Sequence, residues 1–179
     1  MIPPGAAGGE WLDIRVANIR SRALDLSDRK YVELPMDAIQ RHEVRAGDLL
    51  VARAIGSYEQ LGKCIVADPG TEKWAFDSHL MRVRPRRDLA RPEFIWAFLT
   101  SPGGRRIFLN NTRKSAVQFN INVGEFSRIR VPLPDYALQC QFAARAAEVR
   151  NLEGQQTACG ARLDNLLESM LHRASRGEL

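Results

Sequence analysis

The strongest constraint on the fold is a proline-free stretch that runs from Asp135 to Arg173. Alanine, leucine, glutamate, glutamine and arginine dominate it, and it begins directly after the helix-incompatible run VPLP. Asp135 is a suitable N-terminal cap for a helix that starts there. A helix of about 40 residues is roughly 60 Å long at 1.5 Å per residue. This is far longer than a lid on a small domain needs, so we expect the helix to pack against another helix.

Apolar side chains recur along this stretch with the spacing of a coiled-coil seam. The seam positions are separated by seven and then alternately by three and four residues: Phe142, Val149, Leu152, Gln156, Cys159, Leu163, Leu166 and Met170. Gly154 and Gly160 each weaken the helix by about 1 kcal/mol relative to alanine. The pattern predicts a helix that pairs in a dimer or a larger assembly. The alternative is a helix folded back on its own domain.

The residues before Pro134 follow a different pattern, in which short segments alternate with glycine, proline and aspartate. Short runs typical of strands cover residues 14–19, 48–53, 62–67 and 79–85. Helical patterns cover residues 36–43 and 91–110, the second broken at Pro102-Gly103-Gly104. The predicted fold class is α+β, with a mixed-sheet domain over residues 1–134 and one long coiled-coil-type helix over residues 135–179.

Positive charge is concentrated in the first of these regions. The formal net charge is +5, with 21 basic and 15 acidic residues up to Pro134 but 5 basic and 6 acidic residues after it. Such a balance favours a polyanionic partner, because each phosphate contact releases condensed counterions. The alternative is a basic surface that serves solubility. The run RVRPRR at residues 82–87 is more typical of a solvated turn than of a reading element.

Other compositional features exclude several classes of protein. The sequence has no run of about 18 uncharged apolar residues, so it predicts no membrane span. The N-terminal residues lack the basic and apolar regions of a secretion signal. Cys64, Cys140 and Cys159 form no CxxC pair and are expected to be free thiols in a reducing cytoplasm.

If the polyanionic partner is DNA, the first candidate contact site is a polar hairpin with the tip sequence AIGSYEQLG. Its candidate contacts combine two cations, a hydroxyl group and an exposed aromatic ring: Arg53, Ser57, Tyr58 and Lys63. Cations hold phosphates, whereas guanidinium and amide groups fork onto base edges. The alternative is an ordinary solvated hairpin in which Arg53 makes a structural salt bridge.

The second candidate site is the segment NNTRKSAVQFNIN at residues 110–122. Its candidate contacts are two cations, a hydroxyl group and two amides: Arg113, Lys114, Ser115, Gln118 and Asn120. On a strand, the amides and the alternating apolar residues would lie on opposite faces. Glutamine and asparagine can fork onto adenine, but amides also join loops together, and both interpretations of the Q-x-N-x-N run stay open.

No constellation of residues predicts catalysis or a metal site. His42, His79 and His172 lie far apart, without cysteine or carboxylate at ligand spacing. A nuclease would need two acids and a lysine at close spacing. Asp48, Glu59 and Lys63 are too far apart in the sequence to meet this requirement. Gly-rich phosphate loops and GxSxG elements are also missing. We therefore expect a chain with no catalytic group and no cofactor of its own.

Four segments, in order, resemble the specificity subunits of type I restriction-modification systems. They are IRVANIR with the following LDLSDRKYVELP, RAGDLLVARAIGSYEQLGKCIV at 45–66, SAVQFNINVGEFSRIRVPLPDYALQCQFA at 115–143, and LDNLLESMLHRASRGEL at 163–179. No single motif is decisive, but four in the family's order are specific, and the similarity spans nearly the whole chain.

The resemblance implies a target-recognition domain that reads double-stranded DNA and a helix for assembly. Such subunits hold two recognition domains on two antiparallel helices, each domain reading one half of a bipartite site. They carry no catalytic group. Partner methyltransferase subunits use S-adenosylmethionine, and an ATP- and Mg²⁺-dependent restriction subunit translocates and cleaves DNA. A non-catalytic module that docks on a protein and does not read DNA is the alternative function.

The sequence departs from the family pattern in two respects. It holds one recognition domain and one helix where the usual subunit holds two of each. It also has a short lead-in before the first predicted strand. The first departure predicts either a half-subunit that forms a homodimer through its helix or a piece of a longer subunit. The second leaves open whether the recognition domain is complete.

Overall fold

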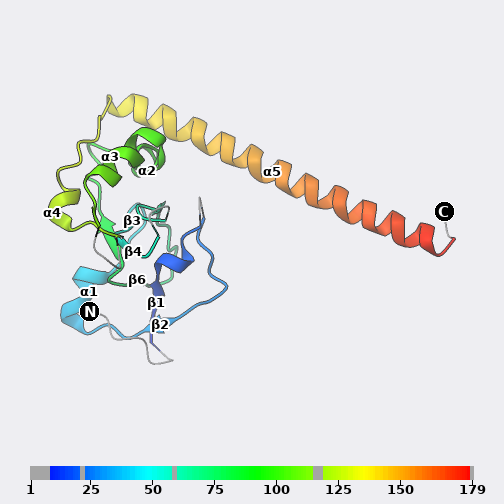
Figure 1. The fold of residues 1–179 in the computed structure, drawn as a ribbon, viewed down its shortest axis with the longest axis horizontal. Coiled ribbons are helices and arrows are strands. Elements are labelled where there is room, and N and C mark those ends of the chain that lie inside the picture. Colours follow the sequence, from blue (N-terminus) through cyan, green and yellow to red (C-terminus); the bar gives the residue numbers. More distant parts are fainter. Residues whose placement is uncertain (1–8, 21–22, 58–59, 115–118, 178–179) are drawn as a thin grey trace. The chain divides into compact units, whose positions relative to one another are not determined.

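The computed structural model describes residues 9–20, 23–57, 60–114 and 119–177 (Figure 1). The chain divides into two compact units, Met1–Tyr136 and Ala137–Leu179. The described residues of the first unit form three sheets of three short strands each, together with short helices. The second consists of nearly all of the long helix α5, Tyr136–Ser175.

One sheet has the strand order β2-β1-β6. Strand β1 (Trp11–Ile14) runs antiparallel to β2 (Tyr31–Val32) and parallel to β6 (Trp74–Phe76). Leu12 and Ile14 are almost completely buried, as expected of alternate residues on a strand with one face on the core. The sheet therefore joins the first described residues to a segment far along the chain, since Leu12 pairs with Trp74.

The strand predicted over residues 14–19 is wrong in its placement, because β1 ends at Ile14. Residues Val16–Asn18 instead form a single 3-10 turn. The buried Asn18 explains the turn: its Oδ1 accepts a hydrogen bond from the Arg15 backbone nitrogen at 2.9 Å, and its Nδ2 donates to the Asp25 carbonyl oxygen at 2.9 Å. A side chain that bonds the backbone in this way competes with a strand ladder.

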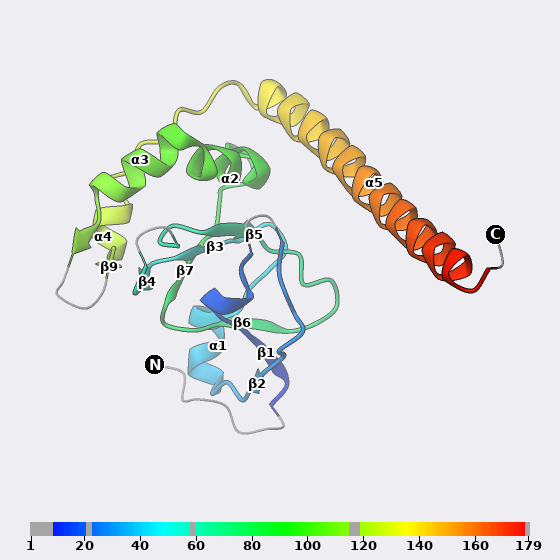
Figure 2. The same ribbon diagram turned by 45° about the vertical axis from the view of Figure 1, so that its right-hand side comes forward.

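The central sheet has the order β5-β3-β7 and confirms three predicted strands. They are β3 (Leu49–Ala52), β5 (Cys64–Val66) and β7 (Leu80–Val83), all antiparallel. Every side chain of β3 is fully buried. Leu50 and Ala52 join the core cluster that contains β1 and β6, whereas Leu49 and Val51 join the cluster beneath α2 and α3. The sheet is thus the middle of three layers (Figure 2).

The predicted helices are also found. Helix α1 spans Met36–His42, α2 spans Pro92–Thr100 and α3 spans Pro102–Asn110. The break between α2 and α3 falls at Ser101, one residue before the predicted Pro-Gly-Gly, so both glycines lie inside α3. The Ser101 hydroxyl accepts a hydrogen bond from the Gly104 nitrogen at 3.1 Å, which caps the new helix.

Helix α5 is continuous over 40 residues, which confirms the long helix predicted from the sequence. It carries a row of apolar side chains that are each 47% to 62% exposed: Val149, Leu152, Leu163, Leu166, Leu167, Met170 and Leu171. No described helix combines the length and the apolar content that crossing a membrane requires. Amphipathic helices of this kind normally cover their apolar face with another helix.

Candidate nucleic-acid interface

The two candidate DNA-contact segments meet in the third sheet, whose order is β4-β9-β8. Strand β9 (Phe119–Asn120) lies in the middle and is antiparallel to both β4 (Ala54–Ile55) and β8 (Arg113–Lys114). Asn120 faces Ala54 on one side and Arg113 on the other. Figure 2 shows β4 and β9 side by side next to α4. A hairpin and a segment far apart in the sequence therefore present one backbone surface.

Arg53 lies where the hairpin leaves the central sheet. Its backbone nitrogen donates to the His79 carbonyl oxygen at 2.9 Å, and its carbonyl oxygen accepts from the Ile121 nitrogen at 3.0 Å. Its side chain is half-buried, and within the described part of the chain the Nε atom is buried without a hydrogen-bond partner. The backbone of Arg53 thus connects the central sheet to the β4–β9–β8 sheet.

The structure describes some of the other residues predicted to contact DNA. The Ser57 carbonyl oxygen accepts hydrogen bonds from the nitrogens of Gln60 and Leu61, both at 3.2 Å, and the Lys63 ammonium lies 3.4 Å from the Gln60 Oε1. The Asn120 side chain is exposed. The backbones of Arg113 and Lys114 form β8. Three predicted residues fall outside the described part of the chain: Tyr58, Ser115 and Gln118.

Asn122, the last amide of the Q-x-N-x-N run, has a structural role. Its Oδ1 accepts a hydrogen bond from the Glu125 nitrogen at 2.8 Å, and the Glu125 Oε2 accepts from the Asn122 nitrogen at 3.0 Å. This reciprocal pair is a capping box that starts helix α4 (Val123–Phe126). The preceding Ile121 is fully buried, so it anchors the end of β9 in the core. Asn122 thus has the structural role that is one of the two interpretations of the run.

The RVRPRR run is largely exposed, as the prediction of a solvated turn expects, and each of its arginines also contacts the protein. Arg84 makes two hydrogen bonds of 2.7 Å to the buried Asp48 carboxylate. Arg82 donates to the Glu43 carbonyl oxygen, and Arg87 to that of Ala46. Arg86 forms an exposed ion pair with its neighbour at position 88. Arg82 is half-buried, whereas the other three arginines are exposed, so the run is a solvated turn with local anchoring contacts.

Asp48, one of the acids that do not fit a nuclease site, has a structural role. It is 2% exposed, and besides Arg84 it accepts a hydrogen bond from the Arg45 nitrogen at 2.8 Å. The hydrogen bonds between Arg84 and Asp48 raise the pKa of the Arg84 guanidinium above its ordinary value. Among the described residues, no group of three or more histidine, cysteine or acidic side chains is arranged to hold a metal ion.

A carboxyl group with a raised pKa lies outside the β4–β9–β8 sheet, on β1. Burial, reinforced by the nearby Asp77, raises the pKa of Asp13 to about 6. A carboxyl group whose folded pKa is raised stabilises the fold most when it is protonated, so this contribution is lost as the pH rises through about 6. Asp13 therefore affects the pH dependence of stability and lies apart from the candidate interface.

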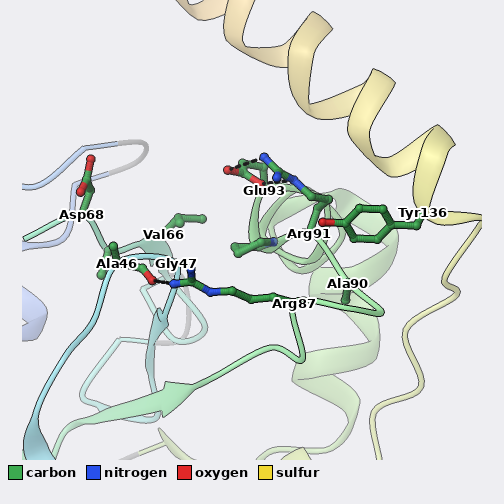
Figure 3. Close-up of a pocket in the computed structure, with 11 residues that line it drawn as sticks. Ala46, Gly47, Val66, Asp68, Arg87, Ala90, Arg91, Glu93 and Tyr136 are labelled. Atoms are coloured by element: carbon green, nitrogen blue, oxygen red, sulfur yellow. Dashed lines mark hydrogen bonds and ion pairs between the residues drawn. The ribbon is translucent and has the colours of Figure 1, made fainter.

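A cleft of about 320 Å³ opens between the start of the central hairpin and the N-terminus of α2 (Figure 3). Three of its charged groups have partners: Arg91 lies 3.2 Å from the Glu93 carboxylate, and Arg87 donates to the Ala46 carbonyl oxygen. Asp68 and Tyr136 complete its polar lining. None of the described lining residues is a serine, cysteine or histidine, so the cleft does not pair a conventional nucleophile with a base.

The fold is that of solved specificity subunits. It matches the HsdS subunit from Thermoanaerobacter tengcongensis with a TM-score of 0.57 and 18% sequence identity, over 85% of this chain and 40% of that chain. A second match, to a chain in a structure of a type I restriction-modification system, has a TM-score of 0.52 and 16% identity over 85% and 40% of the two chains. The predicted α+β class with a long C-terminal helix is thereby confirmed.

Proteins that are similar to this chain in sequence are also specificity subunits. The chain is 29% identical over 181 residues to the specificity subunit of the type I restriction enzyme EcoKI from Escherichia coli strain K12, covering 98% of this chain and 39% of that protein. Identity to the EcoBI subunit of Escherichia coli is 28% over 171 residues, covering 93% and 35% of the two proteins. Identity to the StySPI subunit of Salmonella potsdam is 24% over 180 residues, covering 98% and 39%.

No family model matches the chain. Its curated homologues are nevertheless specificity subunits of type I restriction enzymes, which confirms the resemblance inferred from the four sequence segments. The chain spans about two fifths of the length of these relatives.

Proposed function

We propose that this chain is a sequence-specific DNA-binding subunit of a type I restriction-modification system. The observation that carries the proposal is the β4–β9–β8 sheet, which joins the two segments that had separately been predicted to contact DNA. In this proposal the chain directs methyltransferase and restriction subunits to a bipartite site and has no catalytic group itself. S-adenosylmethionine, ATP and Mg²⁺ are then bound by those partners and not by this chain.

Within this surface we assign two kinds of contact. We assign Arg113 and Lys114 to phosphates because both are cations and their backbones form β8, an edge strand of this sheet. The exposed amide of Asn120, one strand further in, is the described group best suited to a base edge. Gln118 and Tyr58 remain proposed base contacts from the sequence alone.

The double variant Arg113→Ala/Lys114→Ala tests the phosphate assignment. We expect weaker binding to all duplexes. We also expect the slope of log K plotted against the logarithm of the salt concentration to be shallower by about two. Fluorescence anisotropy over a series of salt concentrations measures both. The control variant Arg86→Ala/Lys73→Ala removes two exposed cations from other elements and should leave the slope unchanged. Equal effects of the two variants, or binding that ignores salt, would favour a protein-docking module instead.

We also propose that two copies associate through α5. Val149, Leu152, Leu163 and Leu166 lie on the predicted seam, and each is more than half exposed, at 53% to 61%. Covering these side chains supplies the apolar burial that stabilises a helix pair. Two copies so joined carry two recognition domains, the number that a bipartite site requires.

The order of residues along the seam favours an antiparallel pair. A two-fold axis at the middle of the seam places Val149 opposite Leu166 of the second copy, and Leu152 opposite Leu163. Apolar side chains then face each other in two layers on each side of the axis, and the two sides are identical by the symmetry of a homodimer.

A parallel, in-register pair is less favourable. It would place Glu148 of each copy beside Glu153 of the other, since these positions flank the seam and are five residues apart. Two such contacts between like charges arise in the parallel dimer. Each destabilises it by a few tenths of a kcal/mol.

The polar centre of the seam distinguishes the two orientations. In the antiparallel pair Gln156 faces Cys159 of the second copy, whereas a parallel pair brings the two Cys159 residues together. Cys159 is a free, exposed thiol. In a Cys140→Ser background, we expect Gln156→Cys to form a disulfide-linked dimer under mild oxidation, because facing positions lie within the reach of a disulfide. Non-reducing electrophoresis measures the product.

Two controls complete this experiment. The Cys140→Ser chain without the new thiol should stay monomeric on the gel. The variant Gln156→Cys/Cys159→Ser should also stay monomeric, because residue 156 does not face itself across an antiparallel seam. A cross-linked dimer in either control would contradict the antiparallel arrangement, and no cross-link in any variant would contradict the pairing.

A wider apolar surface marks the C-terminal part of α5. Leu167 and Leu171 are 57% and 62% exposed and lie beside the seam positions. A two-helix seam leaves such flanking positions open to solvent. We assign this additional surface to the methyltransferase subunit, which must contact a part of the chain that does not read DNA.

A further inference from the structure

Helix α3 is attached to the returning strand of the recognition hairpin through Arg105. The Arg105 Nη1 donates a hydrogen bond of 2.8 Å to the carbonyl oxygen of Leu61. The Leu61 side chain is fully buried, so the backbone at this point is held from both sides. The bond joins residues that are 44 positions apart in the sequence.

The next residue of the hairpin fits closely against the same helix. Gly62 has a φ of +73°, and a Cβ atom placed on it would lie 2.9 Å from the ring of Phe108. Its backbone nitrogen donates to the Ala52 carbonyl oxygen at 2.9 Å, and the Ala52 nitrogen donates to the Lys63 carbonyl oxygen at 2.8 Å. The base of the hairpin, defined here as residues 52 and 61–63, is therefore closed against α3.

Phe108 connects the hairpin base to the other half of the candidate interface. Its ring is buried and meets the ring of Phe126 in α4 edge to face, with the ring centres 6.0 Å apart. Phe108 and Ile121, the residue after β9, share one core cluster. Helix α3 ends at Asn110, and β8 begins three residues later. Helix α3 thus contacts the base of the hairpin and leads directly into β8.

We propose that Arg105 is a positioning residue for DNA recognition. Through the Leu61 carbonyl oxygen it fixes the hairpin that carries Arg53 and Lys63 relative to β8 and β9. This role rests on the proposed function, because it concerns the geometry of the surface that would read DNA. Groups that read bases must be held to a fraction of an ångström by the structure behind them, so loosening this contact lowers selectivity.

A positioning residue and a phosphate contact have different signatures. Losing a phosphate contact weakens binding to every duplex and lowers the salt slope by about one. Losing a positioning contact leaves the salt slope unchanged but reduces the discrimination between the preferred duplex and a single-base variant of it. Arg105→Met is a suitable test, since methionine retains the apolar stem and removes the donor groups.

The probes are the duplex enriched by the unaltered full-length chain from a randomised pool and its single-base variants. For Arg105→Met we expect discrimination to fall by roughly tenfold, on the order of one base contact, with an unchanged salt slope. The control Arg106→Met removes the same charge from an exposed neighbour on α3 and should leave discrimination unchanged. A shallower salt slope with intact discrimination would overturn the proposal, as would no effect on binding at all.

A second measurement needs no DNA. Amide hydrogen exchange of the full-length chain should show exchange at Gly62 roughly tenfold faster in Arg105→Met, the effect of one lost hydrogen bond on local opening. Exchange at Leu50 in the buried β3 should be unchanged, which shows that the variant is folded. Unchanged exchange at Gly62 would overturn the proposed attachment even if DNA binding were altered. If the unaltered chain enriched no sequence, the proposed function would fail first, whatever the exchange rates.

Discussion

Replacing Gly104 by alanine is expected to lower the free energy of unfolding by about 3 kcal/mol or more. Helix α3 crosses α2 so closely at this residue that an added Cβ would lie 1.9 Å from the Phe98 carbonyl oxygen and 2.7 Å from its carbon. Both contacts are with backbone, so no side-chain rotation relieves them. The two helices would have to separate, which would also displace the base of the recognition hairpin.

The adjacent glycine provides a matched control. A Cβ at Gly103 would have nothing within 4 Å. Gly103→Ala should therefore be neutral, or stabilising by up to about 1 kcal/mol through helix propensity. Urea denaturation followed by circular dichroism measures both variants. If they shifted the midpoint equally, the close crossing of α2 and α3 would not exist as described.

Removing the carboxylate of Asp48 is expected to have an effect of similar size, a loss of about 3 kcal/mol in the free energy of unfolding. Asp48→Ala leaves the Arg84 guanidinium without its bidentate partner and the Arg45 nitrogen without an acceptor. The Asp48 side chain is 3% exposed, whereas the Arg84 side chain is 38% exposed and regains some solvation, which keeps the loss at the lower end for buried pairs.

Two further substitutions check the cause of this effect. Asp48→Asn keeps an acceptor for the backbone and for part of the guanidinium, so it should be less damaging than alanine. Asp88→Ala removes a carboxylate from an ion pair whose side chains are 63% and 74% exposed, and should change stability by less than about 1 kcal/mol. Thermal unfolding at a single pH compares all three. An Asp88 variant as unstable as Asp48→Ala would contradict the assigned role of burial.

The features that were predictable from the sequence are those set by local patterns. The periodicity between residues 135 and 173 predicts α5, because a helix needs only contacts along its own length to define its pattern. The continuous apolar run of β3 likewise predicts a strand buried on both faces. The short strand β6 was missed, since its three residues become a strand only by pairing with the distant β1.

The interface was predictable as two sets of residue types and not as one surface. The joining strands β4, β8 and β9 have two residues each, which is too short for any alternating pattern. Their register is fixed by long-range bonds such as that from the Ile121 nitrogen to the Arg53 carbonyl oxygen. Arg105 was missed for the same reason: nothing near it in the sequence reveals that it meets Leu61.

The most direct test of the account is the selection of bound duplexes from a randomised pool by the full-length chain together with its methyltransferase subunit. We predict enrichment of two identical half-sites in inverted orientation at a fixed spacing, because a homodimer imposes its two-fold symmetry on the site. Binding should also weaken steeply as salt increases. A pool without any enriched sequence, bound with an affinity that does not depend on salt, would contradict the claim that this chain reads DNA.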